Sequence, residues 1–279
     1  MDPAVIAGVV SGLDRWFESM RVDWPVPGYG GPVVHWWNHC LVYRGTGLDW
    51  RYEGIIDGYL QLWRRSGEER WLAKARRAGD DLVAGQKADG HYTNSRFELN
   101  PGSEGTPHEV ACDVGLLLLA DALGEHGAGY LAAARRNLEN FALGALWDAP
   151  TQTLRDGPEG ISFVPNKAAT FVEAMCLLRS LTGRDELLER YALPTGERIL
   201  DMQVRDSGDQ LDGAIAQNRF GNRVVERYFP IYVARCVPAL LALAAHTGER
   251  RFGEGAKAAV AFLDRVRERD GGFPMVLYP

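Results

Sequence analysis

The stretch Gln86–Leu123, QKADGHYTNSRFELNPGSEGTPHEVACDVGLLLLADAL, decides the fold. It predicts the end of one helix, a long polar loop and the start of a second helix. From Val114 the second helix reads VGLLLLA, which is apolar on every side and typical of a helix enclosed by other helices. Polar and titratable residues therefore stand at the mouth of a buried helix, where a loop can present them to a ligand.

Outward from this stretch, the chain repeats a helix–turn–helix–loop unit with a period of about sixty residues. A glycine just past an apolar helix marks each turn, because glycine commonly follows the last helical residue. Each turn is followed by an amphipathic helix with one wet side. The apolar helices are expected at Gly54–Arg64, Glu109–Leu123, Ala168–Leu181 and Tyr232–His246.

Alternating apolar and amphipathic helices predict an all-α fold of the α/α toroid class. In that fold an inner ring of buried helices is wrapped by an outer ring of half-exposed ones. We expect one domain over residues 1–279 with about four to six helical hairpins. The segment His35–Tyr43 is a candidate for a further inner helix, and Phe273–Tyr278 for a small strand.

In such a toroid, the loops that lead into the inner helices gather on one face, whereas the opposite face carries short turns. The entrance loops concentrate aromatic side chains beside carboxylates, arginine and asparagine. Aromatic faces with hydrogen-bonding groups suit a sugar ring, which has apolar C–H faces and a hydroxyl rim. The candidate substrate-binding residues are Trp36, Trp37, Trp50, Tyr52, Tyr92, Glu104, Asn166, Arg227 and Tyr228.

Four residues at the inner-helix starts are candidates for catalysis. Asp113 lies in the first turn of the buried helix, where a carboxyl group with a shifted pKa can act as acid or base, or simply favour the helix dipole. Asp49 and Glu53 form a second pair of carboxylates, and two carboxylates across a cavity are what glycoside hydrolysis commonly uses. His108 either takes part in proton transfer or only neighbours its helix start.

Composition excludes several other classes of protein. A net charge of −6 without a basic stripe argues against nucleic-acid binding. The N-terminus lacks the basic region and cleavage site of a signal peptide, and no run approaches a membrane span. Four scattered cysteines predict free thiols in the cytoplasm. We expect no metal site and no cofactor, and the oligomeric state stays open.

The repeat pattern resembles the six-hairpin glycosidase-like superfamily, which includes unsaturated glucuronyl hydrolases, sugar 2-epimerases and several polysaccharide lyases. The segment HEVACDVGLL, which starts at His108, looks like the helix entrance of the glucuronyl hydrolases. The resemblance implies that Asp113 corresponds to a family aspartate implicated in catalysis. The family's second aspartate is not apparent in VPNKAATFVEA, where Asn166 and Glu173 stand nearby. The resemblance implies an enzyme that hydrolyses or otherwise processes an oligosaccharide, including one with a uronic acid.

Two other functions stay open from the sequence. Isoprenoid cyclases and hydratase-isomerases also use α/α barrels lined with aromatics, and the turn DGGF is similar to turns in cyclase repeats. Asp49, Tyr52, His108 and Cys112 are the residues available for such chemistry. The cyclase motif D-x-D-D is absent from the sequence. A toroid that only binds a glycan is the remaining alternative.

Overall fold

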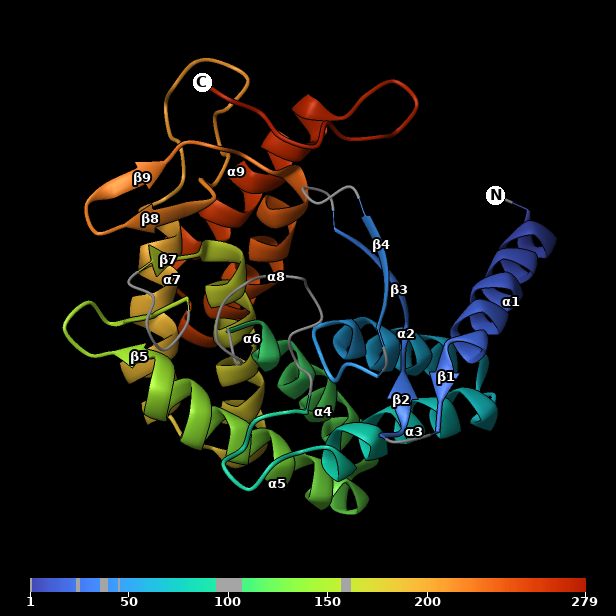
Figure 1. Cartoon of the computed structure of the whole chain (residues 1–279). Helices are drawn as coiled ribbons and strands as arrows, with labels where there is room; N and C mark the ends of the chain where they lie inside the picture. The colour runs from blue at the N-terminus through green and yellow to red at the C-terminus, as the bar shows by residue number, and fades with distance from the viewer. Residues whose placement is uncertain (1, 24–25, 36–39, 45, 94–106, 157–161) are drawn as a thin grey trace.

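The computed structural model describes residues 2–23, 26–35, 40–44, 46–93, 107–156 and 162–279. Helices dominate it and form two concentric layers (Figure 1). The predicted all-α toroid is therefore confirmed. The extent of the domain, residues 1–279, stays a prediction.

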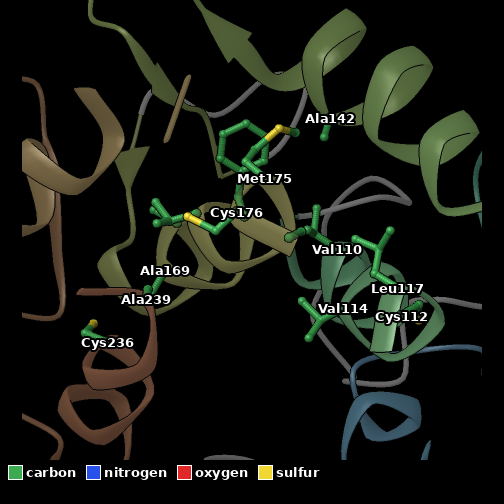
Figure 2. Close-up of a cluster of buried hydrophobic side chains, with 14 of the residues drawn as sticks. Val110, Cys112, Val114, Leu117, Ala142, Ala169, Met175, Cys176, Cys236 and Ala239 are labelled. Atoms are coloured by element: carbon green, nitrogen blue, oxygen red, sulfur yellow. The ribbon is translucent and has the colours of Figure 1, made fainter. Parts of the chain in front are cut away.

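The inner layer consists of the four helices that the sequence predicts; three of them are apolar, whereas the one that begins at Arg51 is amphipathic. Each packs against the next along the chain, so that they form consecutive positions of a ring. Figure 2 shows Val110, Val114, Met175 and Ala239 in the buried cluster that three of these helices share. The inner helices are α2 (Arg51–Ser66), α4 (Val110–Leu123), α6 (Pro165–Thr182) and α8 (Pro230–Thr247).

The outer layer is amphipathic. In the helix after the first turn, one face at helical spacing, formed by Leu72, Ala75, Gly79 and Leu82, is buried, as expected of an amphipathic helix. Burial of such a stripe, rather than helix propensity, supplies most of the stability of a surface helix. The outer elements are α1 (Pro3–Ser19), α3 (Glu69–Ala84), α5 (Ala128–Arg136) with the π-helix η3 (Asn137–Leu146), η4 (Leu188–Ala192) with α7 (Leu193–Leu200), and α9 (Arg250–Val266).

Glycine ends three of the four inner helices as the sequence predicts. Gly67, Gly183 and Gly248 have φ of 70°, 70° and 72°, and each donates its N–H to a carbonyl of the last helical turn. A side chain is strained in this left-handed region, so glycine is the residue that closes the helix at least cost. Gly124 differs, because it opens the 3₁₀ turn η2 (Gly124–Gly127).

Short strands are confined to the entrance loops. One pair corrects an expectation: the described residues of the segment His35–Tyr43, which are His35 and Cys40–Tyr43, belong to paired strands and not to an inner helix. Its sequence around Val33, Val34 and Val42 is rich in β-branched residues, which favour a pleated strand over a helix. The paired strands are β1 (Arg21–Val22) with β2 (Gly28–Tyr29), β3 (Gly31–His35) with β4 (Cys40–Arg44), and β5 (Trp147–Asp148) with β6 (Thr153–Leu154).

Contacts between loops confirm that the entrances share one face. The strand β7 (Ser162–Phe163), in the loop before α6, pairs with β8 (Asn218–Phe220), in the loop before α8, and β8 pairs with β9 (Arg223–Val225). The amide of Leu48, in the loop before α2, donates to the carbonyl of Thr93, in the loop before α4, so these two entrances are also joined. Near the C-terminus, Phe273–Tyr278 contributes an isolated bridge to Tyr228 and no named strand.

The described helices leave the ring open between α8 and α9 on one side and α1 and α2 on the other (Figure 1). α8 consequently exposes a stripe at helical spacing, formed by Ile231, Ala234, Pro238, Leu241 and Ala245. Among the described helices, α8 is also the one whose length and apolar composition would permit a membrane crossing. A single helix of this kind is weak evidence, because core helices of soluble proteins meet the same criterion.

Candidate active site at the starts of the inner helices

Three inner helices bring charged side chains together at the ring opening. Arg235 of α8 donates to Glu53 of α2 at 2.8 Å and to Glu173 of α6 at 2.6 Å. All three side chains are between 21 and 23% exposed, so the cluster is largely desolvated but still reachable. The guanidinium therefore holds two carboxylates from different helices around one point.

The environment of Glu53 favours its protonated form. The pKa of Glu53 is raised to about 7, and burial is the largest cause. The Arg235 charge lowers this pKa, whereas the Glu173 charge raises it further. The free energy of a carboxylate rises when water is removed around it, and here this cost exceeds the attraction of a shared guanidinium. Glu53 thus exchanges a proton near neutral pH, which is what a general acid or base requires.

His108 lies close to this cluster. It belongs to η1 (Pro107–Glu109), which packs against α6. Burial lowers the pKa of His108 well below its usual value, and the positive charges of Lys167 and Arg235 lower it further. Lys167 itself bonds Asp156 at 2.5 Å. His108 is therefore a neutral imidazole at pH 7, able to donate from one ring nitrogen and accept at the other.

Asp113 lies deeper, inside the wall of the ring. Its side chain is 0% exposed, and the Tyr92 hydroxyl donates to its Oδ1 at 2.7 Å. Burial raises the pKa of Asp113 well above its usual value, the Tyr92 hydrogen bond opposes this, and Glu109 adds to it. Within the described residues, Oδ2 has no hydrogen-bond partner. The geometry describes a buried carboxyl group under the entrance face, and its catalytic role stays a prediction.

We expect Asp113→Asn to change turnover by less than about tenfold and to cost about 1 kcal/mol of stability, because an amide of similar shape replaces a sealed carboxyl group and can still accept from Tyr92. The paired measurement is the melting temperature and the turnover of the variant beside Tyr92→Phe, which removes the hydrogen-bond donor. A hundredfold loss of turnover at an unchanged melting temperature would instead assign proton transfer to Asp113.

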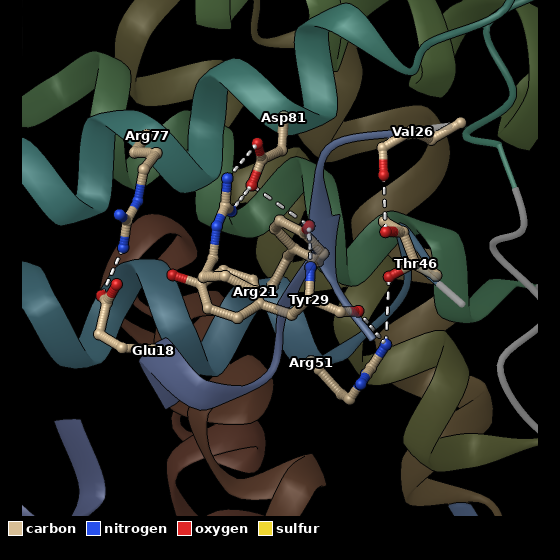
Figure 3. A network of polar contacts seen from close by, with 10 residues as sticks. Glu18, Arg21, Val26, Tyr29, Thr46, Arg51, Arg77 and Asp81 are labelled. Carbon is tan, nitrogen blue, oxygen red and sulfur yellow. Dashed lines mark hydrogen bonds and ion pairs between the residues drawn. The ribbon is translucent and has the colours of Figure 1, made fainter. Parts of the chain in front are cut away.

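Two other predicted residues hold the first entrance loop together. Asp49 is fully buried and accepts from the backbone N–H and the guanidinium of Arg51. The same guanidinium donates to the carbonyl of Tyr29 (Figure 3). Tyr52 is buried, and its hydroxyl accepts from the Tyr29 amide and donates toward Asp81. The structure therefore gives Asp49 and Tyr52 partners that fix the loop onto α2 and α3.

The remaining predicted binding residues are spread over the entrance face. Trp50 precedes α2 and is 44% exposed, whereas Asn166 and Tyr228 are buried and Arg227 is exposed. The binding roles of these four residues stay predictions. No group of three potential metal ligands occurs among the described residues. Three predicted residues lie outside the described part of the chain, namely Trp36, Trp37 and Glu104.

No protein-family model matches this sequence, and no curated protein matches it either. Solved structures do. A sugar epimerase from a ruminal bacterium superposes with a TM-score of 0.66 at 15% identity, over 95% of this chain and 71% of its own. A GH76 α-mannanase of Bacteroides thetaiotaomicron gives 0.67 at 11% identity, over 96% and 71%. The chain shares the α/α toroid fold of these two enzymes.

A cellobiose 2-epimerase of Bacillus thermoamylovorans shares this fold at a TM-score of 0.63 and 12% identity, over 85% of this chain and 67% of its own. Similarity at this level of identity concerns the arrangement of helices. The reaction therefore has to be argued from the side chains that the toroid places together.

Sequence reasoning missed Arg235, although a signal was present. Arg235 is the one arginine or lysine in the run Tyr232–His246, which is otherwise apolar apart from its tyrosine and final histidine. A charge in a buried helix requires a partner, so such a residue marks a polar centre. In the sequence, Glu173 stands out only by its place near the expected second aspartate. No pattern in the neighbouring residues shows that it contacts Arg235.

The raised pKa of Glu53 makes stability depend on pH. The folded state holds this proton more tightly than the unfolded chain, so Glu53 favours folding most at low pH. That contribution is lost as the pH rises from about 4.5 towards 7. We expect the free energy of unfolding of the wild type to fall by about 2 kcal/mol relative to Glu53→Gln across this window. Denaturant titrations at pH 5 and pH 8 measure the difference, and parallel curves would contradict it.

Proposed function

We propose that this protein is a carbohydrate-processing enzyme that acts on an oligosaccharide or glycoside by general acid–base catalysis at Glu53. The observation that carries the proposal is the cluster of Glu53, Glu173 and Arg235, in which burial brings one carboxyl group to a pKa of about 7. The toroid fold, which the chain shares with a mannanase and two epimerases, supports a sugar substrate.

The residues suit a division of roles. A protonated Glu53 can give its proton to a leaving sugar oxygen, and Glu173, the second carboxylate, supplies negative charge beside a developing positive centre. Arg235 positions both carboxylates at once and keeps Glu173 and Glu53 from repelling each other. Neutral His108 can serve as a hydrogen-bond donor or acceptor for a substrate hydroxyl.

The test is a screen of purified protein against oligosaccharides built from glucose, mannose and uronic acids. Products are separated by chromatography, so that hydrolysis, elimination and epimerisation are told apart in the same run. Glu53→Gln serves as the blank. We expect turnover of at least one class of sugar by the wild type and turnover at least about 10²-fold slower by the blank. Equal product from both proteins, or turnover of isoprenoid alcohols alone, would overturn the proposal. The cytoplasmic location stays a prediction.

A further inference from the structure

An apolar pocket of about 670 Å³ lies at the ring opening. We call it the Trp50 pocket. Trp50 and Tyr232 carry the side-chain N–H and O–H groups of its lining, and every other lining side chain is hydrocarbon, proline or thioether. Its walls come from the start of α2, the start of α8, the end of α9 and the segment after α9, and they include Trp50, Phe229, Tyr232, Leu263, Phe273 and Met275.

The Trp50 pocket lies beside the carboxylate cluster, although neither Glu53 nor Arg235 lines it. Trp50 stands three residues before Glu53, and Tyr232 stands three residues before Arg235. Residues three or four apart on a helix lie on one face, one turn from each other. Because Glu53 and Arg235 bridge α2 and α8 at 2.8 Å, the pocket lies one helical turn beyond that bridge. A molecule bound in the pocket thus extends towards Glu53.

The lining selects an apolar occupant. A sugar ring in this pocket would leave most of its hydroxyl groups without partners, and each unpaired polar group costs free energy on leaving water. An alkyl or aryl group has no such cost and gains from burial, at about 0.8 kcal/mol per methylene. The volume lies within the range of pockets that hold small molecules. Ile231 and Met275 are 73% and 64% exposed, so the structure leaves apolar surface there for a ligand to cover.

We propose that the Trp50 pocket binds the apolar aglycone of a glycoside whose sugar lies at Glu53. This inference rests on the proposed function and names its substrate class: a sugar linked to an alkyl, aryl or prenyl group. The aglycone fills the space between α2 and α8, and the glycosidic oxygen then falls on the side of Glu53, one turn away.

Isothermal titration calorimetry on the full chain tests the inference. The probes are octyl glucoside and octyl mannoside below their micellar concentrations, the matching methyl glycosides, and 1-octanol. We expect at least one octyl glycoside to bind at least tenfold more tightly than its methyl counterpart and than 1-octanol. Equal binding of 1-octanol and both octyl glycosides would show a site for free apolar alcohols and overturn the aglycone assignment. If none of the octyl probes binds, the Trp50 pocket is not a ligand-binding site, and the proposal is overturned.

A matched pair of variants locates the binding. Ile231→Asp places a charge in the Trp50 pocket, and Leu241→Asp places one on the same exposed stripe of α8 but outside the pocket. We expect Ile231→Asp to weaken the octyl glycoside at least tenfold and Leu241→Asp to leave its affinity within twofold. An equal loss in both variants, or a wild-type dimer that both variants dissociate, would identify the stripe as a protein contact and overturn the proposal.

The experiments can refute the proposed function and the aglycone site independently of each other. Glu53→Gln retains every lining residue, so it is expected to bind the octyl glycoside as the wild type does while turnover is lost. Tight binding without turnover of any sugar by the wild type would refute the proposed function alone. Turnover of oligosaccharides with no preference for octyl over methyl glycosides would refute the aglycone site alone.

Discussion

Replacing Glu53 by glutamine is expected to reduce turnover about 10²-fold or more, because proton transfer by a positioned side chain typically contributes that much. The amide keeps the shape of the carboxyl group but cannot give up or take a proton at neutral pH. At pH 5 Glu53 is protonated, so the exchange there replaces one neutral group by another and the melting temperature should change little. Substrate affinity should also change little, because the amide keeps the shape of the carboxyl group.

The measurement is turnover at saturating substrate, the dissociation constant and the melting temperature of the same preparations. Glu254→Gln is the matched control, because Glu254 is an exposed carboxylate on α9 that pairs with Arg250 of its own helix. The control is expected to behave as the wild type. If Glu53→Gln retains more than a tenth of the turnover, Glu53 is not the proton donor, and the assignment passes to Glu173 or Asp113.

Replacing Arg235 by methionine is expected to produce the largest loss of stability. Two largely buried carboxylates, Glu53 and Glu173, would lose the cation that both contact. Removal of one partner of a buried ion pair costs about 3–5 kcal/mol. Since these side chains retain about a fifth of their exposure, we expect roughly 2–3 kcal/mol at pH 8. The loss should be smaller at pH 5, where Glu53 is neutral in either protein.

Denaturant unfolding at both pH values gives the free energies, and Arg250→Met is the control. Arg250 is 91% exposed and makes a surface pair, which is worth at most about 1 kcal/mol. The double variant Arg235→Met with Glu53→Gln should recover at least about 1 kcal/mol, because one uncompensated charge is removed. If the single variant is as stable as the wild type at pH 8, the cluster does not hold the inner helices together.

The layers of the toroid were predictable because the residues that become buried recur in the sequence at regular helical spacing. The segment around Leu116 and Leu117 is apolar on every side, and the structure buries it except for Leu118, which is partly exposed. The face of Leu72, Ala75 and Leu82 repeats at helical spacing, and it is the buried face of α3. Turns are local in the same way, since Asp89 accepts from the amide of His91 two residues on.

The hairpin at His35–Tyr43 was mistaken for a helix because it is short. Over nine residues, an apolar run does not distinguish a buried helix from a strand, and the pairing of β3 with β4 decided between them. The pattern of residue types still contained the answer in part, because β-branched residues cluster there.

The sequence by itself determined the architecture and the face of the ring that holds polar residues. Only the tertiary structure decided which of them meet. Asp113 and Glu53 look alike in sequence, each in the first turn of an inner helix, yet one is sealed beneath the entrance face and the other contacts Arg235, 182 residues away. Helix periodicity reports burial within a few turns of chain. A charge cluster and a pocket depend on how separate helices are placed around the ring, which no local pattern records.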